Sequence, residues 1–142
     1  MGAGAWWVWN RFVSVHTALY RVSGGLLGGT YRGAPVLLLH HVGRKSGLER
    51  VNPLIYLRDG ADLVIVASKG GSHRHPIWWL NLREMSETTV EVGGQRHRVA
   101  VRQASSEEKA EVWPRLVEIY PPYADYQARS SRDIPVIRLS PA

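Results

Sequence analysis

The sequence predicts a mainly β fold with helices, in which short strands form an antiparallel barrel or a curled sheet. Two hairpin signals favour this fold, Asp59-Gly60 and Gly93-Gly94, because each lies between two stretches that are typical of strands. The third observation is spacing, since six strands are expected over residues 36–139 and most are joined by short turns.

The expected strands show two kinds of pattern. Residues 36–42 form a continuous apolar run that ends in His40 and His41, whose side chains we expect on opposite faces of the strand. By contrast, Val99 and Val101 alternate with arginines, which is typical of a half-buried strand. In chain order, the expected strands are Val36–Val42, Asn52–Arg58, Leu63–Ser68, Thr88–Val92, Arg96–Val101 and Ile134–Leu139.

An N-terminal helix is expected from Trp6 to Val22, because apolar residues recur there at helical spacing and glycine pairs follow. We expect this helix to pack on the domain. Peripheral contact with a membrane surface through its tryptophan-rich face is the alternative.

Two further helices are expected between the strands. One begins at His75-Pro76 and runs to about Glu84, with proline near its first turn. The other covers Lys109–Ile119 after a capping signature at residues 105–108. We expect a single domain over residues 1–142, with the helix at 1–22 and the barrel, including its sites, at 34–142.

Composition narrows the class of protein. The chain has 142 residues, a net charge of +6 and no cysteine, so disulfides, thiolate nucleophiles and cysteine-ligated metals are excluded. The histidine spacing matches no ligand set, and we expect no metal. No stretch has the length of apolar residues that a membrane span needs, and no signal peptide is present, so a cytoplasmic protein is expected.

The most basic short segment is Gly43-Arg44-Lys45-Ser46-Gly47, which we call the basic turn, followed by Arg50. Glycines permit a sharp turn with exposed N–H groups, while arginine, lysine and serine offer donors to phosphate or carboxylate. The spacing is neither that of a Walker loop nor that of a nucleophile elbow. From the residues alone, a solvated hairpin loop remains the alternative.

Three other groups of residues are candidates for binding or chemistry. Ala67-Ser68-Lys69-Gly70-Gly71, the glycine turn, presents backbone amides at a strand end. Trp78 and Asn81 share one helix face, and Tyr120, Tyr123 and Tyr126 are spaced by three. Core packing is the alternative for both aromatic groups. Nucleic-acid binding is disfavoured, because the basic residues are spread through hairpins.

Together these segments resemble the deazaflavin (F420)-dependent nitroreductase family, from about Leu27 to the C-terminus. The sequence departs from the family pattern at His40, His41, Ile55 and Trp79, which leaves the substrate open but does not touch the basic turn. The matching strings, in the family's order, are Gly43-Arg44-Lys45-Ser46-Gly47, Arg50-Val51-Asn52-Pro53-Leu54, Tyr56-Leu57-Arg58-Asp59-Gly60, Ala67-Ser68-Lys69-Gly70-Gly71, Pro76-Ile77-Trp78-Trp79-Leu80-Asn81-Leu82, Tyr120-Pro121-Pro122-Tyr123 and Asp133-Ile134-Pro135.

The resemblance implies a split β-barrel like that of FMN-binding proteins. It also implies coenzyme F420, an 8-hydroxy-5-deazaflavin whose phosphate and oligoglutamate tail are strongly anionic. By family pattern, the phosphate and tail lie on Arg44, Lys45, Ser46 and Arg50, and the ring system on Pro53, Ala67, Ser68, Lys69, Gly70, Ile77, Trp78 and Asn81. The candidates for substrate contact and catalysis are Tyr120, Tyr123, Tyr126 and Ser68.

The implied activity is hydride transfer from reduced F420 to an electron-poor small molecule, such as an activated alkene or lactone, a quinone or a nitroaromatic. Two other functions stay open: an FMN-dependent oxidoreductase on the same barrel, and a non-catalytic carrier of F420 or lipid. The oligomeric state, monomer or dimer, and the proton donor are not specified by the sequence.

Overall fold

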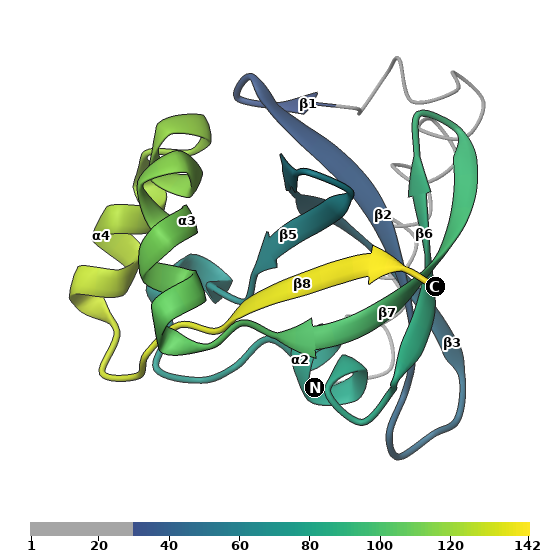
Figure 1. The fold of residues 1–142 in the computed structure, drawn as a ribbon. Helices are drawn as coiled ribbons and strands as arrows, with labels where there is room; N and C mark the ends of the chain where they lie inside the picture. The colour runs from purple at the N-terminus through teal and green to yellow at the C-terminus, as the bar shows by residue number, and fades with distance from the viewer. Residues whose placement is uncertain (1–29) are drawn as a thin grey trace.

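The computed structural model describes residues 30–142. The expected helix at residues 1–22 lies outside the described residues and stays a prediction, as does the single domain over 1–142. Figure 1 shows the strands curled around a common interior, with α3 and α4 together against one flank and α2 at one end. Within the described part, no helix is both long and apolar enough to cross a membrane.

The described chain contains eight strands, two more than expected. The additions come from a short first strand and from the division of one expected strand into two. The strands are β1 (Thr30–Tyr31), β2 (Ala34–Val42), β3 (Glu49–Ile55), β4 (Leu57–Asp59), β5 (Asp62–Val66), β6 (Glu87–Val92), β7 (Gln95–Gln103) and β8 (Val136–Pro141).

The sheet closes into a barrel at Tyr56, where one continuous segment pairs with both ends of the strand order. Strands β2, β6, β7, β8, β5 and β4 are paired in that order, and β3 pairs with the other edge of β2. Only Tyr56 separates β3 from β4, and its N–H donates to the carbonyl of Pro35 at 3.0 Å. The bent segment β3–β4 therefore joins both ends of the sheet, which makes the fold mainly β and split-barrel-like, as expected.

This change of partner corrects the expected strand Asn52–Arg58. It is wrong as one strand, because the segment pairs with β2 up to Ile55 and with β5 from Leu57 onward. Both hairpin predictions are confirmed: Gly60 lies between β4 and β5, and Gly93-Gly94 between β6 and β7, all with positive φ.

Two hydrophobic clusters stabilise the fold, one inside the barrel and one beneath α3 and α4. Strand β5 contributes to both, since Leu63 and Ile65 belong to the first cluster while Val64 and Val66 belong to the second. Successive strand residues point to opposite faces, so the apolar run of β5 is covered on both sides. The second cluster fixes α3 and α4 to the sheet, and with them the tyrosines.

The expectation of only two helices after the N-terminal one is wrong. The described part contains α2 (Ile77–Leu82), α3 (Ser106–Ile119), α4 (Pro122–Arg129) and a short 3-10 turn, η1 (Lys69–Gly71). Helix α4 begins with proline at a position where the missing N–H is tolerated, so Pro121-Pro122 starts a helix instead of a loop. The predicted capping box is confirmed, with reciprocal hydrogen bonds between Ser105 and Glu108.

Candidate functional site

The basic turn connects β2 to β3 at the end of the barrel where α2 also lies (Figure 1). Its backbone is held by two hydrogen bonds, from Gly43 N to Leu48 O at 2.9 Å and from Gly47 N to Gly43 O at 2.8 Å. Gly47 has φ +71°, a conformation that favours glycine. Residues 44–48 are all exposed, so an ordered backbone presents exposed side chains.

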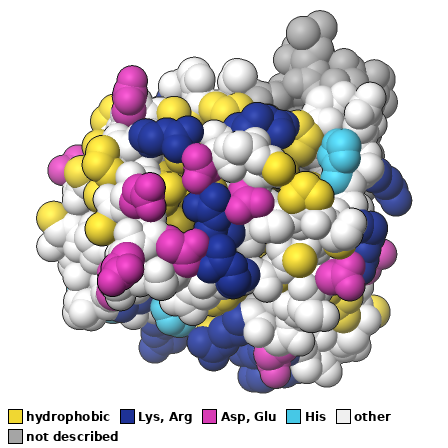
Figure 2. All heavy atoms as spheres, viewed as in Figure 1, with side chains coloured by type: hydrophobic (Ala, Val, Ile, Leu, Met, Phe, Trp, Pro, Cys, Tyr) yellow, Lys and Arg dark blue, Asp and Glu magenta, His cyan; other side chains and the backbone are white. Residues whose placement is uncertain are grey.

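The cations near this turn have no acidic partner in the described part of the chain. Arg102, Lys109, Arg115 and Arg138 all form ion pairs with carboxylates, and Figure 2 shows both charges intermixed on the face with α3 and β8. Within residues 30–142, no carboxylate pairs with Arg44, Lys45 or Arg50, nor with Lys69 in the glycine turn. The basic turn therefore concentrates positive charge that no carboxylate of the described residues neutralises.

Asn81 connects the basic turn to α2. Its Oδ1 accepts from the backbone N–H of Arg44 at 3.0 Å and from the Arg44 guanidinium at 3.3 Å. Its Nδ2 meets Nδ1 of His41 at 3.1 Å. Both amide atoms of this predicted cofactor residue are thus engaged within the protein. Burial lowers the pKa of His41 below its ordinary value of 6.5, and the nearby Arg50 lowers it further, although the hydrogen bond with Asn52 opposes the shift.

The glycine turn contains three successive residues with positive φ: Lys69 at 46°, Gly70 at 61° and Gly71 at 83°. Arg132 holds this turn from both ends, donating to the carbonyls of Ser68 at 2.8 Å and Ser72 at 2.9 Å. The N–H of Ala67 donates to Pro135 O at 2.9 Å, so that amide is already satisfied.

The three tyrosines form one cluster, which we call the tyrosine cluster, and the prediction that they share a side is confirmed. The ring centroid of Tyr120 lies 4.9 Å from that of Tyr123 and 6.1 Å from that of Tyr126, and the Tyr123 and Tyr126 centroids are 6.3 Å apart. The hydroxyls of Tyr120 and Tyr126 are hydrogen-bonded at 3.2 Å. Tyr31 extends the cluster, with its ring 6.1 Å from Tyr120.

Burial makes two of these phenols weaker acids. It raises the pKa of Tyr120 to about 12, with a contribution from the Tyr126 hydroxyl, and it raises the pKa of Tyr123 further. Both are therefore neutral hydrogen-bond donors around neutral pH.

The remaining predicted residues lie on β3 and α2. Pro53 is on β3 opposite Leu38, where its missing N–H is tolerated because β3 pairs only with β2 among the described strands. Trp78 belongs to the core with 7% of its surface exposed, and Trp79 is also buried. Ile77, in contrast, is 56% exposed. Packing accounts for most of both tryptophan rings, and contact of Trp78 with a cofactor stays a prediction.

Two residues near the site carried no sequence signal for it. Arg132 is 64 residues from Ser68, and His41 is 40 residues from Asn81. Neither Arg132 nor His41 belongs to a local pattern that assigns it to a site, and only the folded chain brings these residues to the two turns. Among described residues, the basic turn contacts Asn81 on α2, and the glycine turn contacts Tyr126 of the tyrosine cluster through Gly71.

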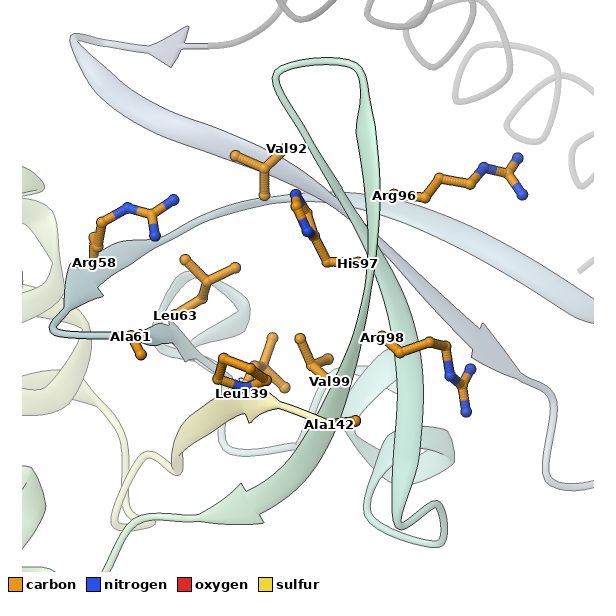
Figure 3. Close-up of a pocket in the computed structure, with 11 residues that line it drawn as sticks. Arg58, Ala61, Leu63, Val92, Arg96, His97, Arg98, Val99, Leu139 and Ala142 are labelled. Carbon is orange, nitrogen blue, oxygen red and sulfur yellow. The ribbon is translucent and has the colours of Figure 1, made fainter.

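One cavity, of about 390 Å³, lies elsewhere in the molecule, between the β4–β5 hairpin, the β6–β7 hairpin and the end of β8. Figure 3 shows Leu63, Val99 and Leu139 at its centre, while Arg96 and Arg98 extend away from it. It contains none of the predicted site residues. In the described part of the chain, no group of three His, Asp or Glu side chains is placed to hold a metal ion.

The fold and the site together define a split-barrel-like protein with an unneutralised cationic turn, suited to a strongly anionic ligand. The chain belongs to the F420H2-dependent quinone reductase family, whose model matches residues 12–141. The resemblance to F420-dependent enzymes is confirmed. The protein is an oxidoreductase with F420 as its hydride-donating cofactor and electron-poor small molecules as acceptors.

Individual relatives agree with the family. An F420H2-dependent quinone reductase of Mycobacterium tuberculosis strain H37Rv is 38% identical over 134 residues, covering 92% of this chain and 90% of its own length. A solved F420H2-dependent reductase (FDR-A) has a TM-score of 0.68 at 36% identity, covering 75% of this chain and 94% of its own. A structure described as a domain-swapped dimer has a TM-score of 0.71 at 31% identity, covering 93% and 97%.

Proposed function

We propose that the basic turn and Arg50 bind the phosphate and oligoglutamate tail of F420. The observation that carries this assignment is that three cations, Arg44, Lys45 and Arg50, cluster within residues 44–50, and that within residues 30–142 none of them pairs with a carboxylate. An ordered backbone with exposed arginine, lysine and serine side chains fits an anionic chain better than a neutral one. The donor set of the turn therefore matches the chemistry of the tail.

The ring system is proposed to lie over the glycine turn. Ser68 is in the right-handed region and residues 69–71 have positive φ, so the turn begins with an αR–αL pair, a conformation whose successive N–H groups can bind polar ligand atoms. Arg132 keeps that arrangement by bonding two carbonyls of the turn. The exposed side chain of Ile77 supplies an apolar contact on α2.

When bound, F420 in its reduced form supplies the hydride. The chain contributes orientation: the basic turn holds the tail, and the tyrosine cluster is proposed to hold the acceptor. Because the pKa values of Tyr120 and Tyr123 are raised, these phenols serve as hydrogen-bond donors to an acceptor oxygen as it gains negative charge. The Ser68 hydroxyl and water are the alternative sources of a proton.

The acceptors are proposed to include activated alkenes such as coumarin-type lactones, and nitroaromatics, in addition to quinones. All three are flat and electron-poor, and each carries an oxygen that accumulates charge on reduction. Tyrosine rings offer apolar area for a flat molecule together with a hydroxyl for its oxygen. The tyrosine cluster therefore suits acceptors that are flat and electron-poor.

A titration separates this function from its alternatives. The full-length protein is mixed with F420, FMN or a single-stranded oligonucleotide while tryptophan fluorescence is recorded. We expect saturable binding of F420 but not of FMN or the oligonucleotide. Tight binding of FMN together with no binding of F420 would overturn the proposal. Steady-state oxidation of reduced F420 with a menadione-like or coumarin-like acceptor then distinguishes an enzyme from a carrier, which would show binding without turnover.

A further inference from the structure

A buried chain of side chains runs from β3 through β2 and α2 to the basic turn. His41 Nε2 lies 2.7 Å from Asn52 Oδ1, and His41 Nδ1 lies 3.1 Å from Asn81 Nδ2. Asn81 Oδ1 then accepts from the Arg44 backbone N–H at 3.0 Å. His41 and Asn81 are each 2% exposed, so these bonds are sheltered from water.

The direction of every bond in this chain follows from Arg44. A backbone N–H only donates, so the atom of Asn81 that faces Arg44 must be the amide oxygen, and the NH2 group must face His41. His41 Nδ1 is then an acceptor without a proton. Its Nε2 carries the proton and donates to Asn52 Oδ1. The network therefore requires the neutral Nε2–H tautomer of His41.

Protonation of His41 would break this chain. A proton on Nδ1 would face the NH2 group of Asn81, and turning the amide over would place that NH2 group against the Arg44 N–H. Either arrangement leaves a buried donor without an acceptor, which is costly. No carboxylate compensates on this face: Arg50 lies opposite His41 on β3, Arg44 lies beyond Asn81, and the neighbouring His40 bonds Glu49 and Glu91.

We propose that His41 and Asn81 are positioning residues, which hold Arg44 in place for the F420 tail only while His41 is neutral. The inference rests on the proposed role of the basic turn. It assigns Asn81 a role through Arg44, in place of direct contact with the cofactor.

The proposal predicts an effect opposite to simple electrostatics. A histidine that gains a positive charge beside an anion site would ordinarily strengthen anion binding. Here, gaining that charge releases Arg44, and binding of the tail becomes weaker. The sign of the change therefore separates the two explanations.

The first test compares two probes: F420, and the deazaflavin fragment that lacks phosphate and tail. His41→Phe and Asn81→Leu should weaken F420 binding about fivefold to tenfold, the effect of one net hydrogen bond, and leave fragment binding unchanged. Thr88→Val is the matched control, because it removes a buried hydrogen bond to the His40 carbonyl without touching this chain. It should change neither affinity.

Each of the following outcomes would overturn one part of the proposal. Equal weakening of both probes in His41→Phe, or unchanged F420 binding, overturns the positioning role. If the wild-type protein binds F420 no more tightly than the fragment, the assignment of the basic turn is overturned. This result needs only the wild-type protein, so it is distinct from the result for the variants.

The second test uses the wild-type protein and needs no variant to fold. The ratio of the F420 dissociation constant to the fragment dissociation constant should rise as the pH is lowered from about 8 to about 5.5, because protonation of His41 releases Arg44. The ratio is used because the ionisation of the ring affects both constants and cancels. Nitrogen-15 NMR of His41 should show the Nε2–H tautomer at the upper pH. A ratio that falls on acidification, or a proton on Nδ1, would overturn the proposal.

Discussion

Gly71 lies directly against the backbone of Tyr126, so the glycine turn and the tyrosine cluster are in contact. A Cβ atom at Gly71 would come within 2.9 Å of the Tyr126 Cα and 3.0 Å of its carbonyl oxygen. Backbone cannot move aside as a flexible side chain can. The proposed ring site and the proposed acceptor site are therefore fixed relative to each other at this contact.

Gly71→Ala should separate the two sites. The substitution adds a clash with α4 to the strain of φ +83°, and we expect the free energy of unfolding to fall by about 3 kcal/mol. Gly70→Ala is the control, since its φ is +61° but nothing lies within 4 Å of its added Cβ, and about 1 kcal/mol is expected. Urea unfolding measures both; equal losses would show that strain alone matters.

Tyr123→Phe tests the hydroxyl without disturbing the fold. Tyr123 is 4% exposed, and no hydrogen bond of its hydroxyl occurs among the described residues, so stability should hardly change. Single-turnover oxidation of bound reduced F420 by a quinone should become about tenfold slower or more if that hydroxyl stabilises the developing charge. An unchanged rate would remove Tyr123 from the mechanism, leaving the Tyr120–Tyr126 pair.

Arg50→Gln should weaken F420 binding by about tenfold at low salt. The loss of F420 affinity should be smaller at about 1 M salt, because exposed charges are screened there. Arg96→Gln makes the same change in net charge on the distant β6–β7 hairpin and should have little effect. If the two variants lose affinity equally, net charge and not the basic turn attracts the cofactor.

Glu108 should make α3 sensitive to acid. Hydrogen bonds from Arg102 and from the Ser105 backbone lower the pKa of Glu108 from 4.5 to about 2. Since the folded-state pKa is depressed, the stabilisation is fully present above about pH 4.5 and is lost as the pH falls towards 2.

Glu108→Gln is the corresponding variant, because glutamine retains an acceptor for the capping box but loses the charge. The variant should be less stable than wild type at neutral pH and equally stable near about pH 2. Thermal unfolding across this range measures the difference; a gap that persists at the lowest pH would mean that packing, not charge, is lost.

Much of the fold was predictable because its signals are local. The glycines of both hairpins adopt positive φ within a few residues of the strands they connect, and the Ser105–Glu108 capping box spans one helical turn. Helix α4 is not predicted by the sequence for an equally local reason, since two prolines suggest a turn although the second is tolerated at a helix start. The tyrosine spacing nevertheless predicts the cluster, because a period of three places residues together on a helix or a turn.

The sequence by itself determined the antiparallel barrel, the exposed cationic turn and the family, since these depend on residue order and short-range geometry. Only the tertiary structure decided where β3 exchanges one partner for another at Tyr56, and that Arg132, Gly71 and His41 support the two turns. The physical reason is that these contacts join residues tens of positions apart. Their energies depend on burial and on donor direction, which exist only once the barrel has closed.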